Sequence, residues 1–271
     1  MTQAVAAILG SAFQDALPEQ VNLRPVEVET AWGRQMLHRV TDADRPAYVL
    51  FRHGVPHRLL PNQINYRAQA AALKEVDCGA LLVTSSVGVL DADVPIYRPL
   101  LVEDLIMLEN RLPDGQACTM FDTPRVGHGH LVLHDGLFSS DLSEQIRTLA
   151  DGEDAPIAGD VVFAYVGGPR GKTAAENRLW PQLGAQVNSM TLAPEVVLAN
   201  ELEIPCAGLV VGHKYSVPTA DAPAGEAMAD TLDRSRAEQE RIVTRFLRDG
   251  SPVSFGNQIY RFDDQSTEAG E

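Results

Sequence analysis

Apolar and polar positions along this chain follow two different periods. Six short apolar runs end at Gly, Pro or charged residues, which is typical of buried strands. These runs lie in residues 4–13, 47–54, 79–90, 98–108, 160–168 and 206–216. Elsewhere, apolar residues recur at helical spacing, which predicts helices within residues 65–76, 173–185, 194–203 and 222–250.

The alternation of strands and helices predicts an α/β fold with a central mixed, largely parallel β-sheet flanked by helices. We expect residues 1–262 to form a single domain, residues 263–271 to be a disordered polar tail and residues 149–160 to be a surface loop. Such sheets bind ligands beyond the carboxyl ends of their strands. The candidate residues are therefore the polar ones just after predicted strands: Ser11, Arg52, His53, Ser85, Ser86, the turn 167–173 and residues 212–216.

The C-terminal helical segment has an apolar stripe and a clear end. Ile242, Val243, Phe246 and Leu247 recur on one face, and Gly250 is a typical helix terminator. We expect this stripe to pack on the core.

The composition narrows the classes of partner. The 271 residues carry a net charge of -15, which disfavours binding to nucleic acid or to anionic membranes. No signal peptide and no membrane-spanning run is recognised, so the sequence predicts a cytoplasmic protein. Three widely spaced cysteines indicate neither a disulfide framework nor a zinc ribbon, and we expect them to be buried.

The most informative stretch is RHGVPHRLLPNQINYRAQAAALKE, residues 52–75. A predicted strand ends in Arg52 and His53, and a helix follows. A guanidinium offers a fork of donors and a histidine can add another, so the pair suits an oxyanion.

This stretch resembles the nucleoside phosphorylase family, in particular the trimeric purine nucleoside and 5'-methylthioadenosine phosphorylases. Four further segments resemble that family in the same order along the chain, over about residues 6–217: ILGSAF, VTSSVGVL, GGPRGKT and NSMTLAPEVVLANELEIPCAGLVV. The resemblance implies a homotrimer that binds a small nucleoside and uses inorganic phosphate as co-substrate, with no cofactor.

The resemblance also implies the roles of individual residues. Ala12 departs from the glycine usual in the family, and a larger residue there would narrow the first loop. The implied phosphate ligands are Ser11, Arg52, His53, Ser85, Ser86 and Thr191, and the implied ribose contacts are Met190, His57 and His130, the last partly across a subunit interface. Buried dianions need several short donors, which these hydroxyls and the guanidinium supply.

The implied base pocket departs from the family pattern. Its residues are Gly168, Gly171, Lys172, Lys214 and Ser216. Gly171 and Lys172 stand where the family has an aromatic residue and an acid, and Lys214 stands where it has Asp or Asn. We expect Lys214 to act on the departing base, with His213 as the alternative catalytic group. Stacking on the base is lost unless Phe163, Tyr165 or Tyr215 supplies it.

Two lysines beside one small pocket favour a base that is rich in carbonyls or carries a carboxylate. The alternative is that both lysines point to solvent.

Three functional hypotheses follow from the sequence. The first is a pentosyltransferase that cleaves the N-glycosidic bond of a purine-type or modified nucleoside, including a 5'-modified or thionucleoside, with phosphate. The second is a protein that binds nucleoside and phosphate without turnover, and the third is a nucleoside hydrolase. We do not expect a metal site, because no carboxylate or cysteine completes one with His128, His130 and His134.

Overall fold

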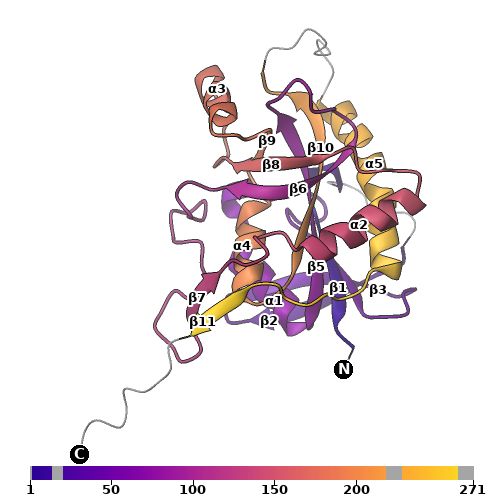
Figure 1. Ribbon diagram of the computed structural model, residues 1–271. Helices are drawn as coiled ribbons and strands as arrows, with labels where there is room; N and C mark the ends of the chain where they lie inside the picture. Colours follow the sequence, from indigo (N-terminus) through magenta and orange to yellow (C-terminus); the bar gives the residue numbers. More distant parts are fainter. Residues whose placement is uncertain (1, 14–20, 218–227, 262–271) are drawn as a thin grey trace, which may run out of the picture.

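The computed structural model describes residues 2–13, 21–217 and 228–261, so the expected tail lies outside the described residues. A nine-stranded sheet runs through the molecule in the order β10-β6-β8-β9-β5-β1-β4-β3-β2 (Figure 1). The strands are β1 (Ala4–Leu9), β2 (Leu23–Thr30), β3 (Gly33–Val40), β4 (Ala47–Phe51), β5 (Cys78–Val89), β6 (Pro99–Ile106), β8 (Asp160–Tyr165), β9 (Val187–Ser189) and β10 (Cys206–Tyr215). Two further strands, β7 (Gly129–Val132) and β11 (Gln258–Arg261), form a small separate sheet.

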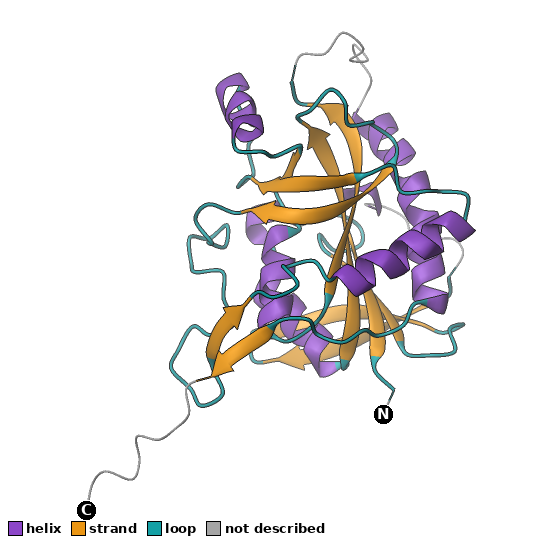
Figure 2. Ribbon diagram, in the orientation of Figure 1, coloured by secondary structure: helices purple, strands orange, loops and turns teal. Residues whose placement is uncertain are grey.

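Helices cover both faces of the sheet, as Figure 2 shows. They are α1 (Tyr66–Glu75), α2 (Ser140–Gly152), α3 (Ala174–Gln182), α4 (Ala193–Glu201) and α5 (Met228–Asp249). The pair α2 and α5 packs on one face, and the pair α1 and α4 packs on the other. The expected α/β fold with a mixed sheet and flanking helices is confirmed.

The alternation of side chains along β1 explains how the two faces are filled. Ala6 and Ile8 join a core cluster under α1 and α4, whereas Val5, Ala7 and Leu9 join a second cluster under α2 and α5. Phe246 of the α5 stripe is fully buried in that second cluster, so the stripe packs on the core as expected. A fully buried side chain of this size stabilises the fold by about 1.5–3 kcal/mol.

Local sequence explains the helix ends near the candidate site. The side chain of Asn65 caps α1 by accepting from the N–H of Ala68, at 3.1 Å. Thr173 caps α3 in a reciprocal capping box with Glu176, which confirms the expected helix start. At the far end of the chain, α5 stops at Asp249, directly before Gly250.

Three parts of the fold differ from the expectation. Ser85 and Ser86 do not follow β5 in a turn but lie within it, because β9 and β10 continue to pair with β5 as far as Val89. The segment 149–160 is not entirely a loop, since its first residues belong to the last turn of α2. The hairpin of β2 and β3 was not predicted from the sequence, and it extends the sheet beyond β4.

Candidate functional site

The parallel strands β5, β1 and β4 are neighbours, and they bring three polar segments to one edge. Leu9 pairs with Phe51, and Ile8 pairs with Val83. The residues that follow in register are therefore Gly10–Ser11, Arg52–His53 and Thr84–Ser86. The side-chain hydroxyl of Thr84 ties this edge together, because it accepts from the N–H of Gly10 at 3.2 Å and donates to the carbonyl of Ile8 at 3.0 Å.

The absence of a side chain at Gly10 makes room for the guanidinium of Arg52. A Cβ atom on Gly10 would lie 2.6 Å from Nη1 of Arg52 and 3.2 Å from the carbonyl oxygen of Thr84. Ala12, by contrast, is accommodated, since it is buried in the core cluster beside Phe13.

Arg52 is 1% exposed and is held from two sides. Its Nε donates to Oε1 of Glu195, a residue in the first turn of α4 that is itself buried. The side chain of Gln69 on α1 donates to the backbone carbonyl of Arg52 at 3.0 Å. Nη2 of Arg52 and Oε2 of Glu195 are buried without a partner among the described residues. A buried donor without a partner costs free energy. Nη2 is therefore a donor that a bound ligand with an acceptor group would satisfy.

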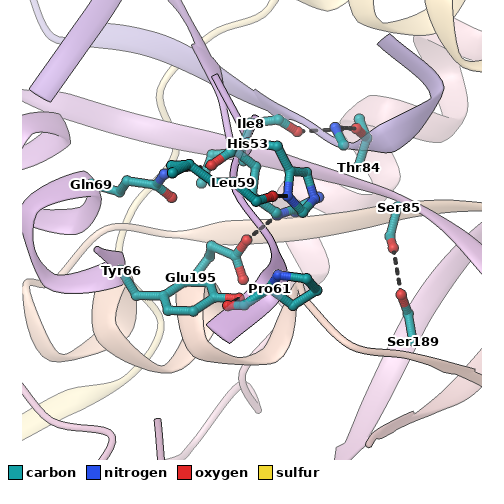
Figure 3. A network of polar contacts seen from close by, with 12 residues as sticks. Ile8, His53, Leu59, Pro61, Tyr66, Gln69, Thr84, Ser85, Ser189 and Glu195 are labelled. Atoms are coloured by element: carbon teal, nitrogen blue, oxygen red, sulfur yellow. Dashed lines mark hydrogen bonds and ion pairs between the residues drawn. The ribbon is translucent and has the colours of Figure 1, made fainter. Parts of the chain in front are cut away.

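Hydroxyl groups from β5 and β9 lie beside this arginine. Ser85 donates to the hydroxyl of Ser189 at 3.2 Å, as drawn in Figure 3, and the hydroxyl of Ser86 is buried without a partner in the described part of the chain. Thr191 is buried and follows β9, four residues before Glu195. The side chain of Gln239 on α5 fixes the backbone at Ser85, to whose carbonyl it donates at 2.9 Å. Arg52 follows β4 and Ser85 lies in β5, the two strands that flank β1, so the strand order brings these residues of the expected phosphate set to one region of the sheet.

His53 differs from the expectation in its hydrogen-bonding role. Its Nδ1 lies 2.8 Å from the carbonyl of Leu59, which can only accept, so Nδ1 carries the proton. Burial, followed by the positive charge of Arg52, lowers the pKa of His53 to about 3. The ring is thus neutral at pH 7, and its buried Nε2 has no proton to donate. In this tautomer Nε2 can only accept, for example from the P–OH group of hydrogen phosphate, so His53 stays a proposed phosphate ligand in a different role from the expected donor.

The lowered pKa of His53 predicts an acid-sensitive fold. His53 takes up a proton near pH 6.5 in the unfolded chain and near pH 3 in the folded chain. Because the unfolded state binds the proton first, the free energy of unfolding keeps its full value above pH 6.5 and decreases as the pH falls toward 3. The loss amounts to about 1.4 kcal/mol for each pH unit within that window. In denaturant titrations between pH 7.5 and 4, His53→Gln should flatten the pH dependence by this amount. Substitution of the exposed His134 by Gln serves as the control. Equal slopes in wild type and His53→Gln would contradict the assignment.

Met190 lies between the phosphate residues and the turn that follows β8. A Cβ atom on Gly168 would lie 2.6 Å from Sδ of Met190, so glycine allows the turn to approach this side chain. His57 stacks on His53 with ring centroids 4.2 Å apart, which places the second expected ribose residue at the same edge.

The turn 167–172 and the loop 107–115 line a pocket of about 510 Å³. Tyr165, Lys172 and Trp180 contribute to its wall, whereas Met190 and Lys214 do not. This pocket therefore lies on the outer side of the turn, beside the sugar position rather than over it. Nothing lies within 4 Å of a Cβ built on Gly171, so the missing aromatic side chain leaves open space.

Of the three aromatic residues considered as substitutes for that side chain, one lines the pocket. Phe163 is fully buried in the core, and the hydroxyl of Tyr215 donates to the carbonyl of Val94 at 3.2 Å. Tyr165 remains, joined by Trp180, whose indole nitrogen is buried without a partner among the described residues.

The ionisable residues of the expected base site form one electrostatic group. Burial, and then the positive charge of Lys214, lowers the pKa of Lys172 to about 8. Burial, followed by the charges of Lys214 and Lys172, lowers the pKa of His213 to about 4. Nδ1 of His213 lies 3.3 Å from the hydroxyl of Thr231 on α5. The pairing of β10 with β5 shifts register at His213, a type of irregularity that often re-aims side chains near functional sites.

Ser216 and His130 have different positions. The N–H of Ser216 donates to the carbonyl of Val89 at 2.7 Å, which fixes it against the end of β5 and close to Gly88. His130 lies in β7 and pairs with Tyr260 of β11, outside the nine-stranded sheet. Figure 1 shows β7 and β11 far from α3 and the turn before it, so one protomer does not bring His130 to the base turn.

Three polar residues of the site were missed from the sequence: Glu195, Gln69 and Gln239. Glu195 had a signal, since it is a single acid inside the apolar segment LAPEVVLAN, where a buried carboxylate needs a cation. The two glutamines act on backbone carbonyls and carry no such signal.

Metal ligands and membrane helices were sought across the described ranges. In residues 2–13, 21–217 and 228–261, no three His, Cys, Asp or Glu side chains gather as a metal site. Over those same residues, no helix has the length and apolar character to cross a membrane. Cys78, Cys118 and Cys206 are buried free thiols, as expected.

Comparison with known proteins places this chain in a family. The model of the phosphorylase superfamily matches residues 5–248. A probable S-methyl-5'-thioinosine phosphorylase of Methanopyrus kandleri is 33% identical over 220 residues, 80% of each chain. An S-methyl-5'-thioadenosine phosphorylase of Thermofilum pendens is 32% identical over 235 residues, 85% of each chain. A crystal structure of a methylthioadenosine phosphorylase from an antarctic soil metagenomic library shares the fold, with a TM-score of 0.76 and 22% identity over 90% of this chain and 85% of that one. The chain therefore belongs to the phosphorylase superfamily.

Proposed function

We propose that this protein is a phosphate-dependent pentosyltransferase that cleaves the N-glycosidic bond of a purine-type nucleoside, including a 5'-methylthio nucleoside. The observation that carries the proposal is the buried Nη2 of Arg52, which has no partner in the described structure and lies at the sheet edge to which Ser11 and Ser85 also belong. Ser86 and Thr191 complete the proposed phosphate set. An inorganic phosphate would supply the acceptor that this cluster of donors lacks. No other cofactor is part of the proposal.

The chemistry follows from where charge develops. An oxygen of phosphate forms a bond to C1' of the sugar while the bond from C1' to the base nitrogen breaks, and the bonding electrons leave with the base. The products are sugar 1-phosphate and a base that takes up one proton. In this proposal Lys214 stabilises the developing negative charge and donates that proton, after which its amine takes a proton from water. His213 is neutral at pH 7, which favours Lys214 over it as the cationic group.

A second function, binding without turnover, is favoured by the composition of the base turn. Gly171 leaves open space where the resemblance implies an aromatic residue, and Lys172 stands where it implies an acid. A protein that had lost catalysis would still bind phosphate through Arg52. Thermal stabilisation by phosphate or nucleoside, without release of base, would identify this case.

The experiment that tests the proposal is an assay of a nucleoside panel with and without phosphate. The panel contains inosine, adenosine and their 5'-methylthio derivatives, and the readouts are free base by chromatography and sugar 1-phosphate by ³¹P NMR. We expect both products, in equal amounts and only with phosphate. Base release that does not depend on phosphate would indicate a hydrolase, and no release from any substrate would overturn the proposal.

The assembly is part of this proposal. His130 lies away from the base turn of its own protomer, so a role for it at the ribose requires a second copy of the chain. The resemblance implies a homotrimer acting in the cytoplasm, and the mass of the protein in solution, measured by light scattering, would distinguish a trimer from a monomer.

A further inference from the structure

Two of the three lysines of this chain lie near enough to influence each other's charge, close to segments that carry the proposed phosphate and sugar residues. Lys74, Lys172 and Lys214 are the lysines among 22 Lys and Arg residues. Lys172 follows the turn whose Gly168 abuts Met190, and Lys214 pairs with Gly88, three residues beyond Ser85 on β5. Lys172 is half-buried and Lys214 is exposed, and both follow segments that carry proposed phosphate and sugar residues, on the side where we place the base of a bound nucleoside.

The described part of the protein does not neutralise the charge of these lysines. Glu176 is the acid nearest to Lys172 in the chain, but Arg170 binds both of its oxygens, at 2.6 and 2.9 Å, and the N–H of Thr173 binds it as well, at 2.7 Å. Over the described ranges, no hydrogen bond or ion pair involves the amine of Lys172 or Lys214. The positive charge of Lys214 is felt at Lys172, where it adds to burial in lowering the pKa. The chain as a whole has a net charge of -15, so two lysines without an acidic partner in the described structure are unusual in it. A ligand with acceptor groups would pair with them.

We propose that Lys172 and Lys214 select the leaving base, favouring one whose edge carries oxo or carboxylate acceptors over one whose edge carries an amino group. This inference rests on the proposed function. An ammonium group has donors only, and so does the exocyclic amine of an amino-substituted purine, so at that position an amino base gives the lysines no acceptor, whereas an oxo group accepts. The two relatives described above are named for a thioinosine and a thioadenosine, so family membership leaves the choice open.

The test uses two nucleosides that differ only at this edge. 5'-Methylthioinosine has an oxo group where 5'-methylthioadenosine has an amino group. The ratio of their kcat/KM values is measured for wild type, Lys172→Met, Lys214→Met and the double variant. Lys74→Met is the matched control, because the amine of Lys74 donates to the carbonyl of Leu202 at 2.8 Å, in an exposed contact. Wild type should prefer the oxo nucleoside, and the preference should fall by roughly 10-fold in each single variant and further in the double variant.

A binding measurement keeps the inference testable when turnover is lost. Calorimetry with hypoxanthine and adenine, in the presence of phosphate, gives the same ratio for the free bases without catalysis. Preference for the amino base in wild type, or an oxo preference that survives in the double variant, would overturn the inference. If wild type binds these bases but cleaves neither nucleoside, the proposed function is wrong, and the ratio of the two binding constants still decides the role of the lysines.

Discussion

Replacement of Arg52 by alanine should lower kcat/KM for phosphorolysis by roughly 10³-fold, which corresponds to about 4 kcal/mol. The reason is that Nη2 of Arg52 is the one charged donor of the cluster that is both buried and unpartnered in the described structure. Removing it leaves hydroxyls alone to bind a dianion, and charge-assisted hydrogen bonds are about twice as strong as neutral ones. The measurement is initial rate against phosphate concentration at a fixed nucleoside concentration.

Two further variants separate this catalytic effect from a folding defect. Arg52→Ala leaves Glu195 buried without its cation, whereas the double variant Arg52→Gln with Glu195→Gln removes both charges at similar volume. The double variant should fold and still lack activity. Arg147→Gln is the surface control, since Arg147 pairs with Asp160 at 2.8 Å, at the amino-terminal end of β8. Near-normal phosphorolysis by the folded double variant would contradict the assigned role.

Substitution of Glu195 by alanine should lower the free energy of unfolding by about 3–5 kcal/mol. Glu195 and Arg52 both have side chains that are 1% exposed, so the variant leaves a guanidinium buried without its counter-charge. Urea titrations of wild type and variant measure the difference. The surface change Asp160→Asn should have little effect, because the partner Arg147 is partly exposed.

A positioning role for Glu195 predicts more than a loss of stability. In Glu195→Gln, which keeps the volume and one oxygen acceptor, the KM for phosphate should rise by roughly 10-fold while the KM for nucleoside changes little. The reason is that Glu195 accepts from the guanidinium that we propose to bind phosphate, so its loss should disturb the phosphate site before the nucleoside site. A fall in stability with no change in the KM for phosphate would show that Glu195 has a structural role alone.

Much of the fold could be predicted because its signals are local. The apolar runs of β1, β4, β8 and β10 end at Gly or charged residues, and the capping residues Asn65 and Thr173 mark helix starts directly. The hairpin of β2 and β3 has a usable signal too, since Val26 and Val28 alternate with acids, but its mostly exposed faces give no continuous apolar run. The continuation of β5 through Ser85 and Ser86 depends on pairing with β9 and β10, which local sequence does not encode.

The candidate site also has features that local sequence indicates and features that only the folded chain shows. Strand order explains why Ser11, Arg52 and Ser85 could be grouped from the sequence, since Ser11 and Arg52 follow the neighbouring strands β1 and β4 and Ser85 lies in β5 beside β1. The partner of Arg52 is 143 residues away, and the tautomer of His53 depends on a loop carbonyl at Leu59. Both require the folded chain, and so does the approach of Lys214 to Lys172.

The most direct test of the phosphate site is a crystal structure of the protein grown or soaked with phosphate. We predict an anion within hydrogen-bond distance of both Nη2 of Arg52 and the hydroxyl of Thr191, with Nε of Arg52 still bound to Glu195. A structure in which the anion binds elsewhere, and Arg52 and Thr191 face apart with nothing between them, would contradict this prediction.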